Sequence, residues 1–265
     1  ITALAFENVR LPDGTLPLLA PMSIIAGQQA ILQGMQFLYN HRGGNGRSLA
    51  TYPGLTPARV LVIGAGSAGL AAARIAAGIG ADVTLVEICT RRIRELQPQL
   101  PENVRILHGG SHPIPSLLPQ TDMLVNTATI PPDAPVHLVN RVDLPLMRQG
   151  SVIVDVTANL RGAIETVDRY TTHDDPVYEV DGIIHYVVSN IPGSVAHTSS
   201  QALAMEVFPY IFRMAELGIV AALHADETLL AGLTAVDGTL TWHEAGENLS
   251  LPWIEPAAAL ARIQV

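Results

Sequence analysis

Lysine is absent from this 265-residue sequence, and all fifteen of its basic residues are arginines. A lysine Schiff base, a lysine general base and a lysine clamp on a substrate carboxylate are therefore excluded within these residues. Acidic residues outnumber basic ones by 24 to 15, and the formal net charge at pH 7 is −9. Such a balance argues against nucleic acids and anionic membranes as partners, because both are bound through basic patches.

Cysteine, aromatic residues and long apolar runs are also scarce. The one cysteine, Cys89, cannot form an internal disulfide, which suits a reducing cytoplasm. Cysteine and histidine show no metal-site spacing, and no apolar run approaches the roughly 20 residues that cross a bilayer. Hydrophobic residues make up 48% of the chain, but aromatic residues only 5%. We therefore expect a cytoplasmic protein without a metal, whose core consists of Ala, Val, Ile and Leu.

Short aliphatic runs recur through the middle of the chain, at intervals that leave room for helices or loops. Near-continuous Val, Ile and Leu in such runs is typical of parallel strands that are covered on both faces. The predicted strands are 59–64, 81–87, 103–107, 122–128, 151–156 and 182–188. The pattern predicts an α/β fold with a doubly wound parallel sheet of the Rossmann type.

Helical periodicity surrounds these strands. Residues 67–79 form an alanine-rich predicted helix between the first two strands, and 22–40 and 197–217 carry apolar residues at helical spacing. We expect a short strand and a turn in 1–20, and short helical pieces in 225–265. The helices 22–40 and 197–217 are predicted to flank the sheet.

A glycine motif connects the first predicted strand to the helix that follows it. Gly64, Gly66 and Gly69 form G-x-G-x-x-G. The first two glycines let the backbone turn and approach a pyrophosphate, and the third lets helix and strand pack closely. The helix N-terminus, which begins with Ser67 and Ala68, offers free N–H groups and a positive dipole end. A glycine-rich turn that serves packing alone is the alternative.

An acidic residue at the end of the second strand supports dinucleotide binding. Glu87 follows Gly69 by 18 residues, where a carboxylate can accept hydrogen bonds from ribose hydroxyls. Packing alone does not explain this acid. A carboxylate there would also repel a 2′-phosphate, so the motif favours NAD over NADP. Arg91 and Arg92 follow closely, and either can instead lie flat against the adenine.

Further candidates lie at the carboxyl ends of later strands, where a doubly wound sheet binds its ligand. Ala128 and Thr129 follow the fourth strand, Asn159 follows the fifth, and Ser189 and Asn190 follow the sixth. Ordinary turn chemistry is the alternative for each polar residue. Their position at successive strand ends favours a shared site.

Two histidines are weaker candidates. His185 lies inside the sixth strand at a buried position, and we interpret it as a satisfied core histidine. His173 lies in the polar segment TTHDDPVYE, which reads as a loop with a small chance of touching a ligand.

Several longer stretches together resemble one enzyme family. They are LPDGTLPLLAPMS, GAGSAG, GSVIVDV, TTHDDPVYEVDGIIHYVVSNIPG and GLTAVDGTLTW. The sequence resembles the alanine dehydrogenase family of the bacterial and cyanobacterial type, which is related to the transhydrogenase alpha subunit. The resemblance implies conversion of L-alanine and NAD to pyruvate, ammonia and NADH, with a small amino or keto acid as substrate. It also implies subunits that assemble into homo-oligomers, usually hexamers, in part through the helix 22–40.

The resemblance further implies a domain plan and a set of cofactor contacts. Residues 1–40 would be a remnant of the substrate domain with a connecting helix, 41–195 the NAD-binding Rossmann domain, and 196–265 a long helix and the end of the substrate domain. Gly109 stands where the family usually has a serine that touches the adenosine. The implied cofactor contacts are Ser23, Gly64, Gly66, Gly69, Glu87, Arg92, Ala128, Thr129, Asn190 and Ile191.

Two departures separate this chain from the family pattern. The family's opening segment, which carries the arginine, lysine and histidine that hold the keto acid, would precede Ile1. The family's essential aspartate, followed by Gln-Gly-Gly, is replaced by Asn159, followed by Leu160, Arg161 and Gly162. Asparagine can hydrogen-bond to ribose or carboxamide, but it cannot act in general acid–base chemistry.

Three functional hypotheses therefore stay open. The chain is an NAD-dependent oxidoreductase whose substrate half comes from a preceding segment or a second chain. Alternatively, it is a non-catalytic NAD(H)-binding module, or an NAD(H)-using enzyme repurposed to a different substrate. Whether it is an enzyme depends on which of these holds, with Asn159 at the expected catalytic position.

Overall fold

The computed structural model describes residues 1–130 and 136–263. The chain divides into two compact units, one formed by Ser23–Val195 and the other by Ile1–Met22 with Ala196–Val265. The larger unit thus begins at Ser23, whereas the family resemblance implies a first domain boundary after residue 40. The reason is that helix α1, Ala20–Gly34, buries one side against the sheet of the larger unit.

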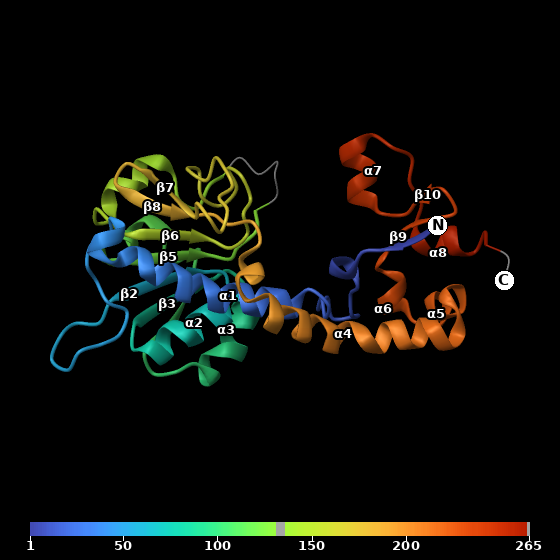
Figure 1. Ribbon diagram of the computed structural model, residues 1–265, viewed down its shortest axis with the longest axis horizontal. Helices are drawn as coiled ribbons and strands as arrows, with labels where there is room; N and C mark the ends of the chain where they lie inside the picture. Colours follow the sequence, from blue (N-terminus) through green and yellow to red (C-terminus); the bar gives the residue numbers. More distant parts are fainter. Residues whose placement is uncertain (131–135, 264–265) are drawn as a thin grey trace. The chain divides into compact units, whose positions relative to one another are not determined.

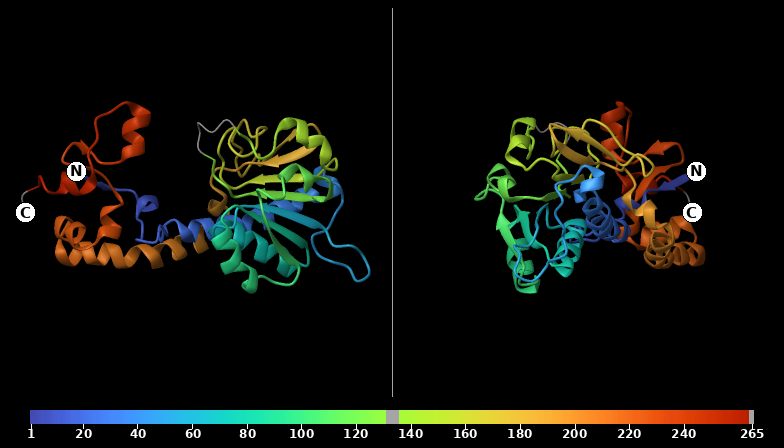
Figure 2. Two further views of the ribbon diagram at one scale, coloured as in Figure 1. Left: turned by 180° about the vertical axis from the view of Figure 1, so that it is seen from behind. Right: turned by 60° about the vertical axis from the view of Figure 1, so that its left-hand side comes forward.

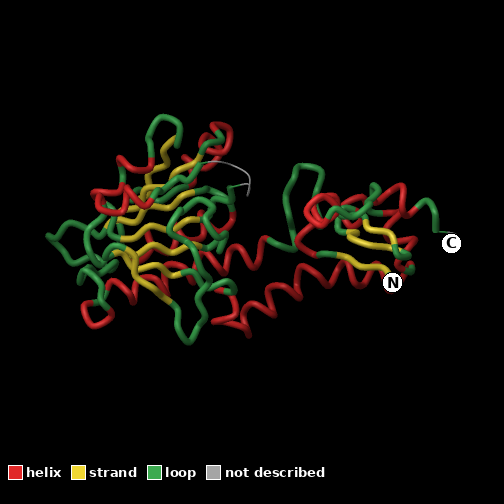
Figure 3. The backbone as a smooth tube through the Cα atoms, turned by 90° about the horizontal axis from the view of Figure 1, so that it is seen from above, coloured by secondary structure: helices red, strands yellow, loops and turns green. Residues whose placement is uncertain are grey.

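Within the described residues of the larger unit, seven strands form one sheet in the order β4-β3-β2-β5-β6-β8-β7 (Figure 3). All neighbouring pairs are parallel except β7 and β8. The strands are β2 Arg59–Ile63, β3 Asp82–Glu87, β4 Val104–His108, β5 Met123–Asn126, β6 Val152–Asp155, β7 Val177–Val180 and β8 Ile183–Tyr186. The six predicted strands and the Rossmann-type parallel sheet are confirmed, and β8 pairs in parallel with β6 as the topology requires.

Strand β7 was not predicted, although the sequence carries a signal for it. Asp181 and Gly182 separate β7 from β8 and have φ values of 52° and 80°. An Asp-Gly pair with both residues at positive φ is the preferred turn of a two-residue hairpin. The apolar run 182–188 predicts β8, whereas β7 is only partly buried and begins in the segment TTHDDPVYE, which reads as a loop from sequence alone.

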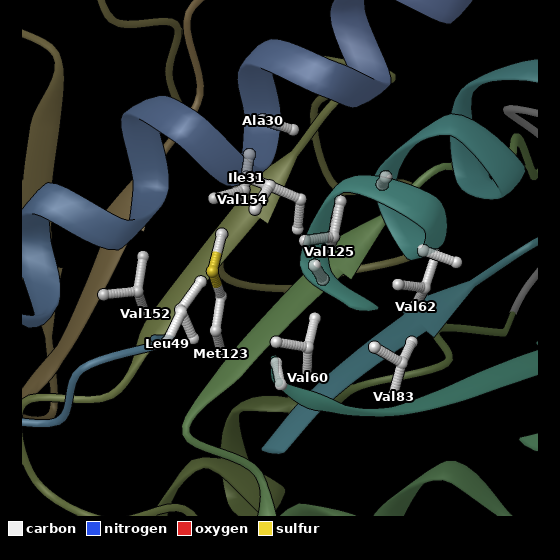
Figure 4. Close-up of a cluster of buried hydrophobic side chains, with 14 of the residues drawn as sticks. Ala30, Ile31, Leu49, Val60, Val62, Val83, Met123, Val125, Val152 and Val154 are labelled. Atoms are coloured by element: carbon white, nitrogen blue, oxygen red, sulfur yellow. The ribbon is translucent and has the colours of Figure 1, made fainter. Parts of the chain in front are cut away.

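One face of the sheet is covered by helices. Helix α1, continued by the 3-10 turn η2 (Met35–Leu38), and helix α2 (Ser67–Ile79) pack here, beside α3 (Thr90–Leu96) (Figures 1 and 2). Valine side chains from β2, β3, β5 and β6 point into this layer together with Met123 (Figure 4). Small alanines on α2 let the helix lie close to the strands, as the alanine-rich segment predicts.

The other face is covered mainly by short 3-10 segments. These are η5 Ile114–Ser116, η6 Leu118–Gln120 and η7 Arg141–Leu146, which bury Ile114, Leu118 and Leu144 over the sheet. Prolines at 113, 115, 119 and 145 explain why longer helices do not form there, since proline removes a donor and clashes with the preceding turn.

The smaller unit combines a three-stranded antiparallel sheet with helices. The strands β1 (Thr2–Leu4), β9 (Leu233–Val236) and β10 (Thr239–Leu240) lie in the order β1-β9-β10. Its helices are α4 Ala196–Leu217, α5 Ile219–Ala225, α6 Glu227–Leu230, α7 His243–Leu249 and α8 Pro256–Leu260, with η8 Ile191–Val195 leading into α4. The expectation that 225–265 contains helical pieces alone was therefore wrong. Asp237 and Gly238, with φ values of 47° and 73°, form a second hairpin turn.

Within residues 1–130 and 136–263, no single helix is both long and apolar enough for a bilayer span. Ile191–Leu217 and Ile219–Ala225 meet the length and composition test as a pair, but they are bent by 117° at their junction.

His185 is a satisfied core histidine, as predicted. It is fully buried in β8, its Nε2 lies 2.8 Å from the Thr166 hydroxyl, and its Nδ1 lies 3.0 Å from the Ile183 carbonyl oxygen. Its ring stacks on Tyr178 with 5.2 Å between centroids. Burial lowers the pKa of His185 from 6.5 to about 4.

This lowered pKa predicts a pH-dependent stability. Between pH 6.5 and about 4 the unfolded chain binds a proton at this site that the folded chain does not, so stability falls as the pH falls. The loss is on the order of 3 kcal/mol. His185→Gln should flatten this part of the profile in urea unfolding between pH 7 and 4.5. The exposed His243→Gln should leave it unchanged, and an unaltered profile for His185→Gln would contradict the assignment.

Candidate functional site

The candidate site lies at the carboxyl edge of the seven-stranded sheet. β2 occupies the position where the strand order reverses, with β3 on one side and β5 on the other. In open parallel sheets, ligands bind at this reversal, outside the carboxyl ends of the strands. The loops after β2, β3, β5, β6 and β8 reach this edge, and they contain most of the predicted site residues.

The three glycines of the first loop have different roles in the structure. Gly64 has a φ of 92°, which favours glycine over any other residue. A Cβ on Gly69 would lie 1.8 Å from the Gly64 carbonyl oxygen and 2.7 Å from Thr127 Oγ1. A Cβ on Gly66 would meet nothing within 4 Å, and the φ of Gly66, −72°, suits any residue. The fold itself therefore does not require glycine at position 66, and the space that a side chain would fill stays open.

The first turn of α2 follows this open space. The earliest hydrogen bond of the helix runs from Leu70 N to Gly66 O, at 2.9 Å. Amides earlier in the turn have no acceptor within the helix, and the helix dipole favours an anion beside them. Ser67 is exposed and Ala68 is half-buried at this end. The arrangement can hold a phosphate group.

Helix α1 passes very close to the same turn. A Cβ on Gly27 would lie 2.0 Å from the Ala68 carbonyl oxygen, so the two helices touch through their backbones. Ser23 precedes Gly27 by four residues and therefore lies on the same side of α1. The predicted contact residue Ser23 therefore lies on the side of α1 that faces α2, one turn from this contact, although the two segments are far apart in sequence.

Glu87 lies at the end of β3, but its carboxylate is already engaged. Its Oε2 accepts a hydrogen bond from Ala65 N at 3.0 Å, and its Oε1 accepts from Ile88 N at 2.7 Å and Cys89 N at 2.8 Å. A carboxylate has about four acceptor positions. One position on Oε2 stays available, so the carboxylate ties the glycine loop to β3 and can still accept from one hydroxyl.

Arg92 and Gly109 lie beside Glu87. Arg92 Nε donates to the Ala65 carbonyl oxygen at 3.3 Å, and its side chain is 40% exposed. Gly109 N donates to the Glu87 carbonyl oxygen at 2.9 Å, just beyond β4. A cavity of about 240 Å³ is lined by Arg92 and Ser67 together with residues of α1 and α2. These groups border the region expected for the adenosine.

The loops after β5 and β6 are joined by side-chain amides. Asn126 Oδ1 accepts from Ala128 N at 3.2 Å, which shapes the start of the β5 loop. Asn159 Nδ2 donates to the Ile130 carbonyl oxygen at 3.1 Å. Exposed Thr129 lies between these two anchors. The structure therefore brings Ala128, Thr129 and Asn159 together at one place.

The contact of Asn159 explains why an amide suits this position. An aspartate has no donor for the Ile130 carbonyl and would place a negative charge beside its oxygen. The surrounding backbone is strained, because Ala158 and Arg161 have φ values of 47° and 51°. Arg161 stands where the family pattern has a glycine, and its positive φ gives a physical reason for that glycine.

The loop after β8 places Asn190 and Ile191 differently. Asn190 is exposed, and its carbonyl oxygen lies 2.8 Å from His173 Nε2. Ile191 is 2% exposed, and its side chain packs in the hydrophobic core. The side chain of Ile191 is therefore engaged in packing, and its main chain is the part that remains for a ligand.

Sequence reasoning missed the buried polar residues at these strand ends. Asn126 and Asp155 are fully buried, and they end β5 and β6 within otherwise apolar runs. A polar residue at the end of such a run was the available signal, since buried polar groups need specific partners.

These features satisfy the requirements of a bound dinucleotide. Gly66 leaves room for close approach, α2 presents its N-terminus, and Glu87 retains one acceptor position. The polar loops after β5, β6 and β8 extend the site along the same edge. The residues present thus fit a dinucleotide such as NAD.

The same assignment follows from comparison with known proteins. The family described as "Alanine dehydrogenase/PNT, C-terminal domain" matches residues 30–243. The chain belongs to this family. The recognition of an alanine dehydrogenase-like, NAD-binding oxidoreductase with a Rossmann-type domain is confirmed.

Individual members of the family agree over almost the whole chain. The alanine dehydrogenase of Methanococcus maripaludis is 42% identical over 260 residues, covering 98% of this chain and 70% of the relative. The alanine dehydrogenase of Bacillus subtilis is 38% identical, covering 98% of this chain and 68% of the relative. The chain thus spans about 70% of the length of these relatives.

Two solved structures share this fold. An L-alanine dehydrogenase superposes with a TM-score of 0.86 at 37% identity, covering 94% of this chain and 68% of that chain. A transhydrogenase from Sinorhizobium meliloti superposes with a TM-score of 0.72 at 22% identity, covering 92% of this chain and 67% of that chain. The second likeness shows a shared fold.

Proposed function

We propose that this chain is the NAD(H)-binding part of an oxidoreductase of the alanine dehydrogenase type. Gly66 is the observation that carries the proposal, because neither its backbone nor its surroundings require glycine, whereas a pyrophosphate does. The N-terminus of α2 holds the pyrophosphate, with Ser23 alongside. Glu87, Arg92 and Gly109 border the adenosine. Ala128, Thr129, Asn159, Asn190 and the main chain of Ile191 face the nicotinamide half.

The residues of this chain bind and orient the cofactor. Bound NAD supplies a hydride acceptor, which none of the amino acid side chains can provide. Asn159 joins the β5 and β6 loops and leaves proton transfer to another group. The loops at this edge exclude water from one side of the nicotinamide.

The substrate class is a small amino or keto acid, with L-alanine and pyruvate as the pair that the family implies. In that family the groups that hold the keto acid belong to the segment before the part matched here. We infer that residues outside Ile1–Val265, from a preceding segment or a second chain, complete the substrate site. The greater length of the relatives supports this inference.

A second function is favoured by one specific observation. Asn159 is hydrogen-bonded as an amide donor, so this position serves loop structure and not proton transfer. The protein would then bind NAD(H) without turnover, or act on a different substrate. Turnover of alanine or pyruvate by the chain separates these alternatives.

Cofactor preference tests the role of Glu87. Glu87→Ala removes the carboxylate that anchors Ala65 and accepts from the ribose, so NADH should bind about tenfold more weakly. The discrimination against NADPH should narrow, because a 2′-phosphate no longer meets a negative charge. Fluorescence titration of both cofactors measures this, with the exposed Glu102→Ala as control. Unchanged discrimination in Glu87→Ala would remove Glu87 from this role.

Homo-oligomer formation is also proposed, with a different surface from the one expected. The apolar side of the helix at 22–40 packs largely against its own sheet, where Ala26, Ala30 and Ile31 belong to the core cluster. Helix α4 instead exposes a row of apolar side chains at helical spacing. These are Met205 (76% exposed), Phe208 (64%), Ile211 (48%) and Phe212 (52%).

Self-association through α4 is therefore the expected result. Sedimentation at micromolar concentration should show an oligomer, and Phe208→Glu should shift it to smaller species because it places a charge within the apolar row. Exposed Glu216→Gln on the same helix is the control. A monomeric wild-type chain would contradict the proposal.

The single, unpaired Cys89 is consistent with the cytoplasmic location that we propose.

A further inference from the structure

A buried carboxyl group lies beneath the loops at the nicotinamide end of the proposed site. Asp155 ends β6 and is fully buried. Its Oδ1 accepts hydrogen bonds from Thr157 N at 2.9 Å, Thr157 Oγ1 at 2.6 Å and Ala158 N at 3.1 Å. A further bond comes from Asn126 Nδ2 at 3.3 Å. One oxygen thus organises four donors.

The second oxygen of the Asp155 carboxyl group has different surroundings. Oδ2 is buried and has no hydrogen-bond partner in the structure. Burial raises the pKa of Asp155 above its ordinary value, against the effect of the bonds to Oδ1. A buried polar atom without a partner destabilises the fold. The buried Oδ2 of Asp155 therefore has a free-energy cost, which the four hydrogen bonds at Oδ1 offset.

The partners of Asp155 belong to two different loops. Asn126 lies directly opposite Asp155 in the register of β5 and β6. Asn126 in turn fixes Ala128 N, while Thr157 and Ala158 lead to Asn159. Asn159 then donates back to the Ile130 carbonyl oxygen. The contacts form a closed circuit from Asp155 through both loops and back.

We propose that Asp155 is a positioning residue, which sets the β5 and β6 loops in the arrangement that receives the nicotinamide half of the cofactor. The assignment rests on the proposed function. Asp155 does not touch the ligand, because its side chain is fully buried, and it does not replace the aspartate that the family pattern has at position 159. The adenosine half is held elsewhere, by the loops after β2 and β3.

This division between the two halves makes the proposal testable by binding alone. ADP-ribose carries the adenosine, pyrophosphate and second ribose but lacks nicotinamide, so NADH and ADP-ribose differ in the part that Asp155 serves. The ratio of their dissociation constants reports on the nicotinamide end. A general loss of stability would weaken both ligands together.

Two pairs of substitutions at Thr157 and Asp155 compare the loss of a hydrogen-bonding group with a change that keeps this group. Thr157→Val removes the hydroxyl that donates to Asp155 and keeps the side-chain shape, whereas Thr157→Ser restores the donor. Asp155→Ala removes the acceptor, and Asp155→Asn keeps an oxygen in its place. Thr121→Val is the matched control, because Thr121 Oγ1 also donates one partly buried hydrogen bond, to Leu117 O at 2.8 Å, at the amino ends of the strands.

The expected result is specific to NADH. Thr157→Val and Asp155→Ala should weaken NADH binding about tenfold and leave ADP-ribose binding unchanged within about twofold. Thr157→Ser, Asp155→Asn and Thr121→Val should resemble the wild type. Thr157 is only half-buried, so its variants keep the test valid if Asp155→Ala fails to fold.

Other outcomes overturn the assignment in distinguishable ways. Equal weakening of NADH and ADP-ribose by Thr157→Val, or no effect on either, would refute the positioning role while leaving the proposed function intact. Equal affinity of the wild type for the two ligands would refute it as well. Binding of neither ligand by the wild type would refute the proposed function, and this inference with it.

Discussion

Gly66→Ala is expected to leave the protein folded and to weaken NADH binding about a hundredfold, which corresponds to about 2.7 kcal/mol. The added methyl group meets no atom of the protein within 4 Å, and the backbone at this position accepts alanine. The methyl group would occupy the space through which a pyrophosphate approaches the loop. The folded structure therefore tolerates the change that the ligand does not.

Gly69→Ala is expected to have the opposite effect. Its methyl group would lie 1.8 Å from the Gly64 carbonyl oxygen, so α2 must move away from β2. Overpacking of this kind costs about 1–3 kcal/mol or more, out of a total stability of about 5–15 kcal/mol. Thermal unfolding should show a clear loss for Gly69→Ala and little change for Gly66→Ala.

Gly78→Ala is the matched control for both variants. Gly78 lies in the same helix, and an added Cβ there also meets nothing within 4 Å. Gly78 lies in the last turn of α2, where alanine should stabilise by at most about 0.5–1 kcal/mol and leave cofactor binding unchanged. Wild-type NADH affinity in Gly66→Ala would show that the pyrophosphate does not lie against this loop.

The 265-residue chain on its own is expected to bind NADH but not to interconvert alanine and pyruvate at a useful rate. Correct positioning of a substrate can supply roughly 7–11 kcal/mol of the barrier, and the family's lysine has no equivalent among these residues. Proton transfer contributes about 10²–10⁴-fold, and Asn159 cannot provide it. Both deficits fall on the same chemical step.

Asn159→Asp is not expected to restore turnover. The aspartate loses the bond to Ile130 O and places a charge beside that oxygen, so the β5 and β6 loops should separate. The double variant Asn159→Asp with Arg161→Gly also relieves the strained φ of 51° at position 161. It is therefore compared with the single variant and with the wild type. NADH consumption with pyruvate and ammonia measures all three proteins.

The outcomes of this assay are informative in different ways. Robust turnover by the wild-type chain would refute the expectation directly. Rescue by Asn159→Asp alone would show that residue 159 limits catalysis and that the substrate groups of this chain suffice. Turnover that appears only when a longer chain or a second chain is supplied would support a completed substrate site.

Local sequence was sufficient for the six parallel strands of the larger sheet and for the glycine loop. Strands 59–64 and 81–87 and the helix 67–79 are recognisable because burial on both faces demands continuous apolar residues, and because the G-x-G-x-x-G spacing reflects backbone geometry within one turn. The hairpins at Asp181 and Asp237 are also marked locally, by Asp-Gly pairs, but the strands β7 and β10 beside them are short and only partly buried.

Tertiary structure decided how the individual site residues are used. Gly66 and Gly69 look alike in the sequence, yet one faces open space and the other a carbonyl oxygen. Glu87 was expected to face ribose, but its oxygens also hold the glycine loop. Asn159 is an amide because a carbonyl from the neighbouring loop needs its donor. Each of these roles depends on an atom distant in sequence, and such a partner exists only once the strands have paired.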